Sequence, residues 1–136
     1  MFATVVSADD KVEQAVEYRQ GVMNIVGWNF KHMGAMAKGK AAFDQAAFAA
    51  YANELLAASR LNLLSGFPED SDESDETAAK AEVWMDWEDF QQKFKDLQQQ
   101  AATLAKVATD GNEEAVKQQF GKTAKTCKAC HKAYKE

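Results

Sequence analysis

Proline and cysteine are scarce in this chain of 136 residues, which contains one proline, seven glycines and two cysteines. Such a composition favours helices, because a β fold with many turns needs more proline and glycine. Two cysteines form one disulfide at most, which excludes a small domain held together by several disulfides. Because 46% of the residues are apolar, we expect an ordered chain that forms a single domain over residues 1–136.

Long apolar runs and an excess of basic charge are also missing. The longest apolar run, residues 46–52, is far shorter than the ~20 residues that span a bilayer, so no membrane span is expected. The net charge of −5 argues against a nucleic-acid binder, which usually presents a basic surface. The first residues, MFATVVSADD, lack the features of a signal peptide. Either the protein is cytosolic, or this is the mature chain of an exported protein.

What the sequence does have is helical periodicity, with apolar residues three and four positions apart. The four periodic stretches cover about residues 12–33, 41–64, 83–108 and 113–134. Ser7 or Asp9 is a suitable N-cap for the first helix, and Gly34 a suitable end. Four such helices bury their apolar stripes most simply as an antiparallel four-helix bundle. The stripe predicted for the second helix is Phe43, Ala47, Tyr51, Leu55, Ala58 and Leu61 or Leu64.

The predicted connection between the second and third helices, residues 65–76, is long and acidic. It contains Pro68 and six acidic residues between positions 69 and 76. We expect either a solvated, mobile loop or a docking surface for a cationic partner.

The most specific signal is a C-x-x-C-H motif formed by Cys127, Cys130 and His131. Residues three apart lie on one face of a helix, so two thiols can add to the vinyl groups of a haem while the imidazole ligates the iron. A structural zinc site usually needs four ligands, and the only other histidine is the distant His32. A thioredoxin-like dithiol starts a helix after a strand, unlike this pair. Two buried cysteines beside a chance histidine are the remaining alternative.

Aromatic residues accompany the motif. Each ring alone is explained by ordinary core packing, but together they predict the large apolar slot that a porphyrin needs, with Phe90 as a lining residue. The rings are Phe30, Phe67, Trp84, Trp87, Phe90, Phe94, Phe120 and Tyr134.

Nearly the whole chain resembles the cytochromes c′, the class II c-type cytochromes, in which the attachment motif also lies near the C-terminus. The matching segments are AVEYRQ (15–20), TAAKAEVW (77–84), FG (120–121) and CKACHKAYK (127–135). The resemblance implies a four-helix bundle that holds one haem c by thioether bonds to Cys127 and Cys130, with His131 as the proximal iron ligand.

The resemblance also implies roles for residues outside the motif. Arg19 and Gln20 correspond to residues that contact the haem edge and its carboxylates, where a guanidinium suits a carboxylate. Thr77 corresponds to a loop position that touches the haem, and Lys135 to a basic residue beside the proximal imidazole.

Met23 corresponds to the residue on the distal side of the iron. In most cytochromes c′ this residue is bulky and blocks the sixth position without binding, which leaves five-coordinate iron open to NO and CO. In similar low-spin members a first-helix methionine ligates the iron and gives an electron carrier. We therefore predict a five-coordinate haem protein that binds NO and CO and exchanges electrons; the alternative is a six-coordinate histidine–methionine cytochrome for electron transfer.

The partners and location follow from the same resemblance. It implies a periplasmic protein and a homodimer formed through the first two helices, with Val5, Val6, Phe48 or Tyr51 as candidate contacts. An enzyme is not expected, because no nucleophile with a paired base is evident. Lysines of the last helix either steer an unidentified acidic redox partner or are simply solvated. These lysines are Lys122, Lys125, Lys128, Lys132 and Lys135.

Overall fold

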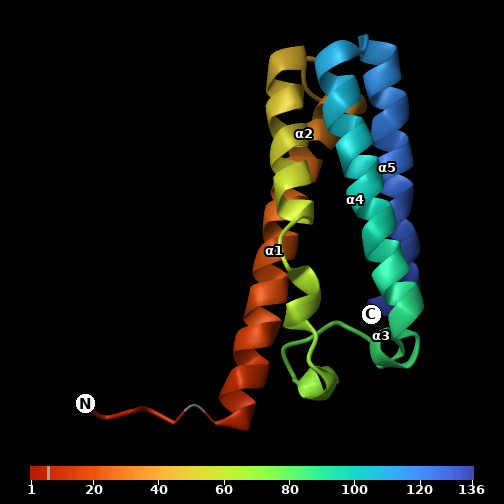
Figure 1. The fold of residues 1–136 in the computed structure, drawn as a ribbon. Coiled ribbons are helices and arrows are strands. Elements are labelled where there is room, and N and C mark those ends of the chain that lie inside the picture. The colour runs from red at the N-terminus through yellow and green to blue at the C-terminus, as the bar shows by residue number, and fades with distance from the viewer. Residues whose placement is uncertain (6) are drawn as a thin grey trace.

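Four long helices form an antiparallel bundle in the computed structural model, which describes residues 1–5 and 7–136 (Figure 1). In chain order the elements are α1 (Ala8–Ala37), α2 (Gln45–Ser59), η1 (Leu63–Gly66), η2 (Glu69–Asp72), α3 (Glu82–Met85), α4 (Trp87–Asp110) and α5 (Glu113–Tyr134). The short helices η1, η2 and α3 belong to the connection between α2 and α4, which crosses one end of the bundle. The predicted all-α bundle with a long second connection is confirmed.

α1 begins and ends at residues with suitable capping chemistry. Ser7 is the N-cap, and its side-chain oxygen accepts a hydrogen bond from the Asp10 amide at 3.2 Å. The predicted end at Gly34 is wrong, because the helix continues past it. Gly34 is buried where a Cβ would lie 3.5 Å from the Phe120 ring. The chain turns away from the helix at Gly39, whose φ of +75° favours glycine.

α2 is shorter than predicted, and its buried face agrees with the predicted stripe at Leu55 and Ala58 but not over the rest of its length. The carboxylate of Asp44 caps the helix by accepting from the Ala47 amide at 2.9 Å, and the helix ends at Ser59 rather than near residue 64. Because the chain leaves the helix there, Leu61 is 41% exposed instead of buried. The residues that α2 buries are Phe48, Ala52, Leu55, Ala58 and Ser59.

The residues predicted as dimer contacts lie in different surroundings. Phe48 is wrongly assigned, because its side chain is fully buried and packs edge-on against Phe120. Val5 is exposed and Tyr51 is half-buried, whereas Val6 lies outside the described residues.

The third predicted helix is interrupted at Asp86, where φ of −114° and ψ of 44° separate α3 from α4. The inward face predicted for residues 83–108 is buried except for Trp87 at the start of α4, which is half-buried; the buried members are Val83, Phe90, Phe94, Leu97, Ala101, Leu104 and Ala108. α5 begins after Asn112, whose side chain accepts from the Ala115 amide at 2.8 Å.

Apolar side chains form two clusters. The main cluster follows the length of the bundle, and the second, built around Val83, Phe90 and Tyr134, lies where α4 begins and α5 ends. Backbone pairing between Ala79 and Lys135 joins the connection to the end of the chain there. Within the described residues, no helix has the combination of length and hydropathy that a membrane crossing requires.

Candidate cofactor site

A cavity of about 480 Å³ lies at the end of the bundle that contains the second cluster. Its walls come from α1, the connection, α4 and α5. Enclosed sites for small molecules and cofactors have volumes of roughly 300–1,000 Å³. All nine residues that the sequence predicted as site residues line this cavity, although they lie far apart in the chain. They are Arg19, Gln20, Met23, Thr77, Phe90, Cys127, Cys130, His131 and Lys135.

The C-x-x-C-H motif occupies the last turns of α5. Cys127 and Cys130 are free thiols, both half-buried in the cavity wall. Burial raises the pKa of Cys127, and it raises the pKa of Cys130 to about 11. A thioredoxin-like dithiol needs a lowered thiol pKa, so these cysteines lack its character. Partial burial and then the charge of Lys135 lower the pKa of His131, which favours the neutral imidazole that ligates metals.

Aromatic side chains form much of the wall. Phe67 meets Phe90 edge-on with 4.9 Å between ring centroids, and Phe90 meets Tyr134 in the same way at 5.3 Å. Of the rings predicted to form the pocket, Phe30, Phe67, Phe90, Phe94 and Tyr134 line the cavity. The others pack around it: Phe120 belongs to the main core, Trp84 contacts Phe67, and Trp87 contacts Phe90.

Arg19 is a buried cation in the cavity wall, only 4% exposed. Its terminal nitrogens donate to the Gly66 carbonyl at 2.8 Å, to the Ser71 hydroxyl at 2.7 Å and carbonyl at 3.2 Å, and to the Thr77 hydroxyl. The guanidinium also lies over the Phe67 ring, 4.6 Å from its centroid. Burial lowers the pKa of Arg19. Among the described residues no carboxylate accepts a hydrogen bond from it, so this position suits an anionic group of a ligand.

The acidic connection is attached to α1 beside Arg19. Gln20 donates to the Glu76 carbonyl at 2.7 Å, and Ser74 donates to the Glu13 carboxylate at 2.9 Å. The acidic side chains between positions 69 and 76 are exposed, as a solvated segment requires, whereas Ser71 among them is fully buried. The connection is therefore fixed to the cavity wall at several points.

Met23 and Lys135 contribute to the cavity from α1 and from the end of α5. Met23 follows Arg19 by one helical turn and is half-buried. Lys135 is exposed, and its amide donates to the His131 carbonyl at 2.9 Å. The structure places both residues in the wall, and their roles toward a haem stay predictions.

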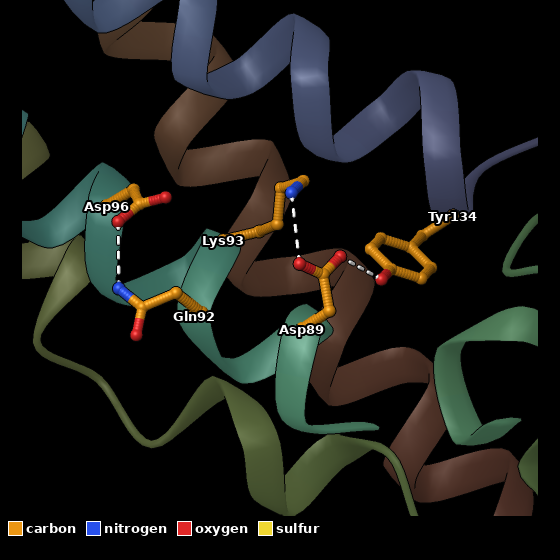
Figure 2. A network of polar contacts seen from close by, with 5 residues as sticks. All are labelled: Asp89, Gln92, Lys93, Asp96 and Tyr134. Carbon is orange, nitrogen blue, oxygen red and sulfur yellow. Dashed lines mark hydrogen bonds and ion pairs between the residues drawn. The ribbon is translucent and has the colours of Figure 1, made fainter. Parts of the chain in front are cut away.

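A polar network that the sequence analysis missed lies at the edge of the cavity (Figure 2). Tyr134 donates its hydroxyl proton to Asp89, and Lys93 donates to the other carboxylate oxygen at 3.3 Å. The hydrogen bond from Tyr134 lowers the pKa of Asp89, and burial raises the pKa of Tyr134. An acid and a lysine four residues apart are common on any exposed helix face, so their spacing gave no signal of a site.

The residues of the cavity fit a covalently attached haem. Two thiols three positions apart and an adjacent imidazole match its attachment chemistry, and the apolar walls suit a porphyrin. Arg19 places a buried positive charge in the same wall, which suits the carboxylates that a haem carries. Over residues 1–5 and 7–136, no group of three His, Cys, Asp or Glu side chains is placed to hold a metal ion by itself.

Comparisons with known proteins agree with this fit. A family model described as "Cytochrome C'" matches residues 14–135. The solved structure of cytochrome c prime from Shewanella frigidimarina is 41% identical, with a TM-score of 0.87 over 92% of this chain and 96% of that chain. The nitric oxide complex of a mutant cytochrome c prime from Alcaligenes xylosoxidans is 31% identical, with a TM-score of 0.82 over 92% and 95%. A cytochrome c' with an unusual ligand-controlled dimer dissociation is 29% identical, with a TM-score of 0.84 over 91% and 95%.

Proposed function

Because the chain belongs to the cytochrome c′ family, we propose that it binds nitric oxide, and less strongly carbon monoxide, at the iron of its haem. Like the other members of this family, the chain is a c-type haem protein with one covalently attached haem. The observation that carries the proposal is the single cavity that unites the attachment motif with Arg19 and Met23. In this proposal the protein binds small uncharged gases and exchanges electrons, and it does not act as a catalyst.

Three residues of α5 hold the haem in this proposal. Cys127 and Cys130 form its two thioether bonds, and His131 ligates the iron. The bound haem supplies an iron with one coordination position that a small gas can occupy. The lowered pKa of His131 favours the neutral imidazole that this ligation needs.

Met23 controls the distal side in this proposal. Its half-buried side chain occupies space in a cavity with apolar walls, so a diatomic gas enters more easily than a larger or charged ligand. We favour this role over iron ligation by Met23, because a similar structure is a nitric oxide complex.

Arg19, Gln20 and Thr77 hold the haem edge. A buried guanidinium forms short, strong hydrogen bonds with a carboxylate, and Arg19 is buried in the wall with neutral acceptors only among the described residues. Phe90 contributes an apolar surface for the porphyrin, and Lys135 places a positive charge near His131.

Optical titration of the haem-loaded protein tests this function. We expect a high-spin ferric spectrum, and we expect the ferrous protein to bind one NO or one CO per chain. A low-spin spectrum typical of histidine–methionine ligation, with no uptake of NO in excess, would contradict the proposal and support the electron-transfer alternative.

We also propose a periplasmic location, because thioether attachment in bacterial c-type cytochromes occurs outside the cytoplasmic membrane. The lysines predicted to guide a redox partner are exposed on α5 and, for Lys135, directly after its end. Their charge suits an acidic redox partner, and its association would weaken as salt increases. Those lysines are Lys122, Lys125, Lys128, Lys132 and Lys135.

We propose a second copy of the chain as the partner of α1. Tyr18, Ile25 and Trp28 lie on one face of this helix and are 40%, 43% and 60% exposed. An apolar stripe of this kind fits an isologous contact between two copies. A similar structure is described by its dimer dissociation, which supports a dimer as the occupant.

A further inference from the structure

The connection between α2 and α4 contains a serine, Ser71, that accepts hydrogen bonds from Arg19. No sequence motif identifies this serine. Ser71 provides two of the acceptors for the guanidinium, its hydroxyl at 2.7 Å and its carbonyl at 3.2 Å. The same hydroxyl donates its own proton to the Pro68 carbonyl at 2.7 Å. This donation orients an oxygen lone pair toward Arg19, and the Ser71 side chain is fully buried.

The backbone of the connection is fitted closely to α1 at this point. A Cβ at Gly66 would lie 2.9 Å from the Arg19 Cβ and 3.2 Å from the Ala15 carbonyl oxygen, so only glycine allows this approach. The Gly66 carbonyl thereby comes within 2.8 Å of the guanidinium. Together with Thr77, the connection supplies acceptors to both terminal nitrogens of Arg19.

We propose that Ser71 is a positioning residue that fixes the guanidinium of Arg19 at the cavity, so that its charge acts on the bound haem from one orientation. The inference rests on the proposed haem site. A charge held in a buried, poorly hydrated place acts more strongly than one that moves into water. A positive charge near the iron stabilises the reduced form of the haem. Because Ser71 holds the charge of Arg19 in place, it raises the reduction potential of the haem.

A merely structural role for Ser71 predicts a different result, and the chain contains a matched control. Ser74 belongs to the same connection and also bonds to α1, through the Glu13 carboxylate at 2.9 Å. Its hydroxyl does not bond to Arg19 among the described contacts. Ser71→Ala and Ser74→Ala therefore each remove one attachment of the connection to α1, but only the first removes an acceptor of the Arg19 guanidinium.

The experiment compares haem-loaded parent, Ser71→Ala and Ser74→Ala proteins by redox titration and by amide hydrogen exchange over residues 66–77. We expect Ser71→Ala to lower the reduction potential and to accelerate exchange about tenfold, as the loss of a buried bond to a charged group implies. Ser74→Ala should accelerate exchange near the substitution and leave the potential unchanged. An unchanged potential in Ser71→Ala, or an equal fall in Ser74→Ala, would overturn the proposal.

A second variant covers the case in which Ser71→Ala does not fold or load haem. Thr77→Val keeps the side-chain shape and removes another acceptor of Arg19, so the potential should fall in the same direction; an unchanged potential overturns the proposal. Binding of NO, measured on the same samples, separates the two hypotheses. Normal NO binding with an unmoved potential refutes the role of Ser71 alone, whereas loss of NO binding in the parent refutes the proposed function.

Discussion

In the proposed function, Met23 is the residue whose side chain limits how much of the cavity a gas can enter. It is half-buried on α1, one turn after the buried Arg19, in a wall that is otherwise largely apolar. A thioether is flexible and adapts to irregular space, so it can yield to a diatomic ligand at a modest cost in free energy.

Met23→Ala should raise the affinity of the ferrous protein for CO by about tenfold, because the ligand no longer has to displace a side chain at a cost of roughly 1.4 kcal/mol. Equilibrium CO titration of the haem-loaded variant measures this change. Met85→Ala is the matched control, since Met85 is 76% exposed on α3. An unchanged spectrum and CO affinity in Met23→Ala would show that Met23 neither blocks nor ligates the iron.

At the scale of single residues, the sequence predicts which side chains lie together where their spacing in the chain is short. Cys127, Cys130 and His131 are close in the chain, so their arrangement follows from one helix. Ser71 and Asp89 could not be predicted, because their contacts with Arg19 and Tyr134 join residues that are 52 and 45 positions apart. Serine in an acidic run and aspartate on an exposed helix are both ordinary at the level of sequence.

The end of α5 is held by a set of contacts that fix the segment after His131. Tyr134 packs its buried ring against Phe90 and donates to Asp89. The Lys80 amide donates to the Tyr134 carbonyl at 2.9 Å. These contacts stabilise the last turn of the helix that bears the attachment motif.

Tyr134→Phe should lower the melting temperature of the haem-loaded protein at neutral pH by about 3 °C, because it removes a hydrogen bond but keeps the buried ring. Thermal unfolding of the variant and of Tyr51→Phe, a half-buried tyrosine on α2 outside the exposed stripe of α1, measures the difference. An equal change in both variants would contradict a specific role for the hydroxyl.

The pH dependence of this loss follows from the direction of the two pKa shifts. The pKa of Asp89 is lowered in the folded protein, so its contribution is present above the ordinary value of 3.8 and disappears as the pH falls through the lowered value. The pKa of Tyr134 is raised, so its contribution is present below the ordinary value of 10.0 and disappears as the pH rises through the raised value. The effect of Tyr134→Phe should therefore be largest between these limits and smaller outside them.

The presence of the helices was predicted more accurately than the residues at which they begin and end. The repeat of apolar residues over α4 is long and regular, so its inward face was correct from Phe90 to Ala108. In α2 many alanines fit several registers equally well. The prediction ran past Ser59, and it identified Leu55 and Ala58 but missed Phe48 and Ala52. Gly34 was misread as an end because a glycine inside a helix looks the same in the sequence as a glycine that ends one; a Cβ there would make only ordinary contact with Phe120, at 3.5 Å.

At the scale of the whole molecule, the sequence predicted the bundle but not the way in which its connection closes the site. Four amphipathic stretches have few ways to bury their stripes, so the architecture follows from periodicity. The connection depends instead on hydrogen bonds from single residues such as Arg19 and Gln20, which periodicity does not encode. Its exposed acids and the exposed lysines of α5 give the molecule an uneven charge distribution around the cavity.

The exposed stripe on α1 leads to a prediction about assembly. Trp28 is 60% exposed and is the largest side chain of the stripe that also includes Tyr18 and Ile25. A large aromatic residue at the centre of a contact typically contributes 2 kcal/mol or more, so Trp28→Glu should weaken the dimer by roughly 30-fold or more. Sedimentation equilibrium over a range of protein concentrations measures this dissociation constant.

Met85→Glu is the control, because it adds the same charge at an exposed apolar residue of α3, away from the stripe. It should leave the dimer intact. A parent protein that stays monomeric at high concentration, or a Trp28→Glu variant that dimerises as the parent does, would contradict the proposed contact. α1 also carries Arg19 and Met23 in the cavity wall. Measuring the dimer dissociation constant with and without CO tests whether gas binding at the cavity and dissociation of the dimer are coupled.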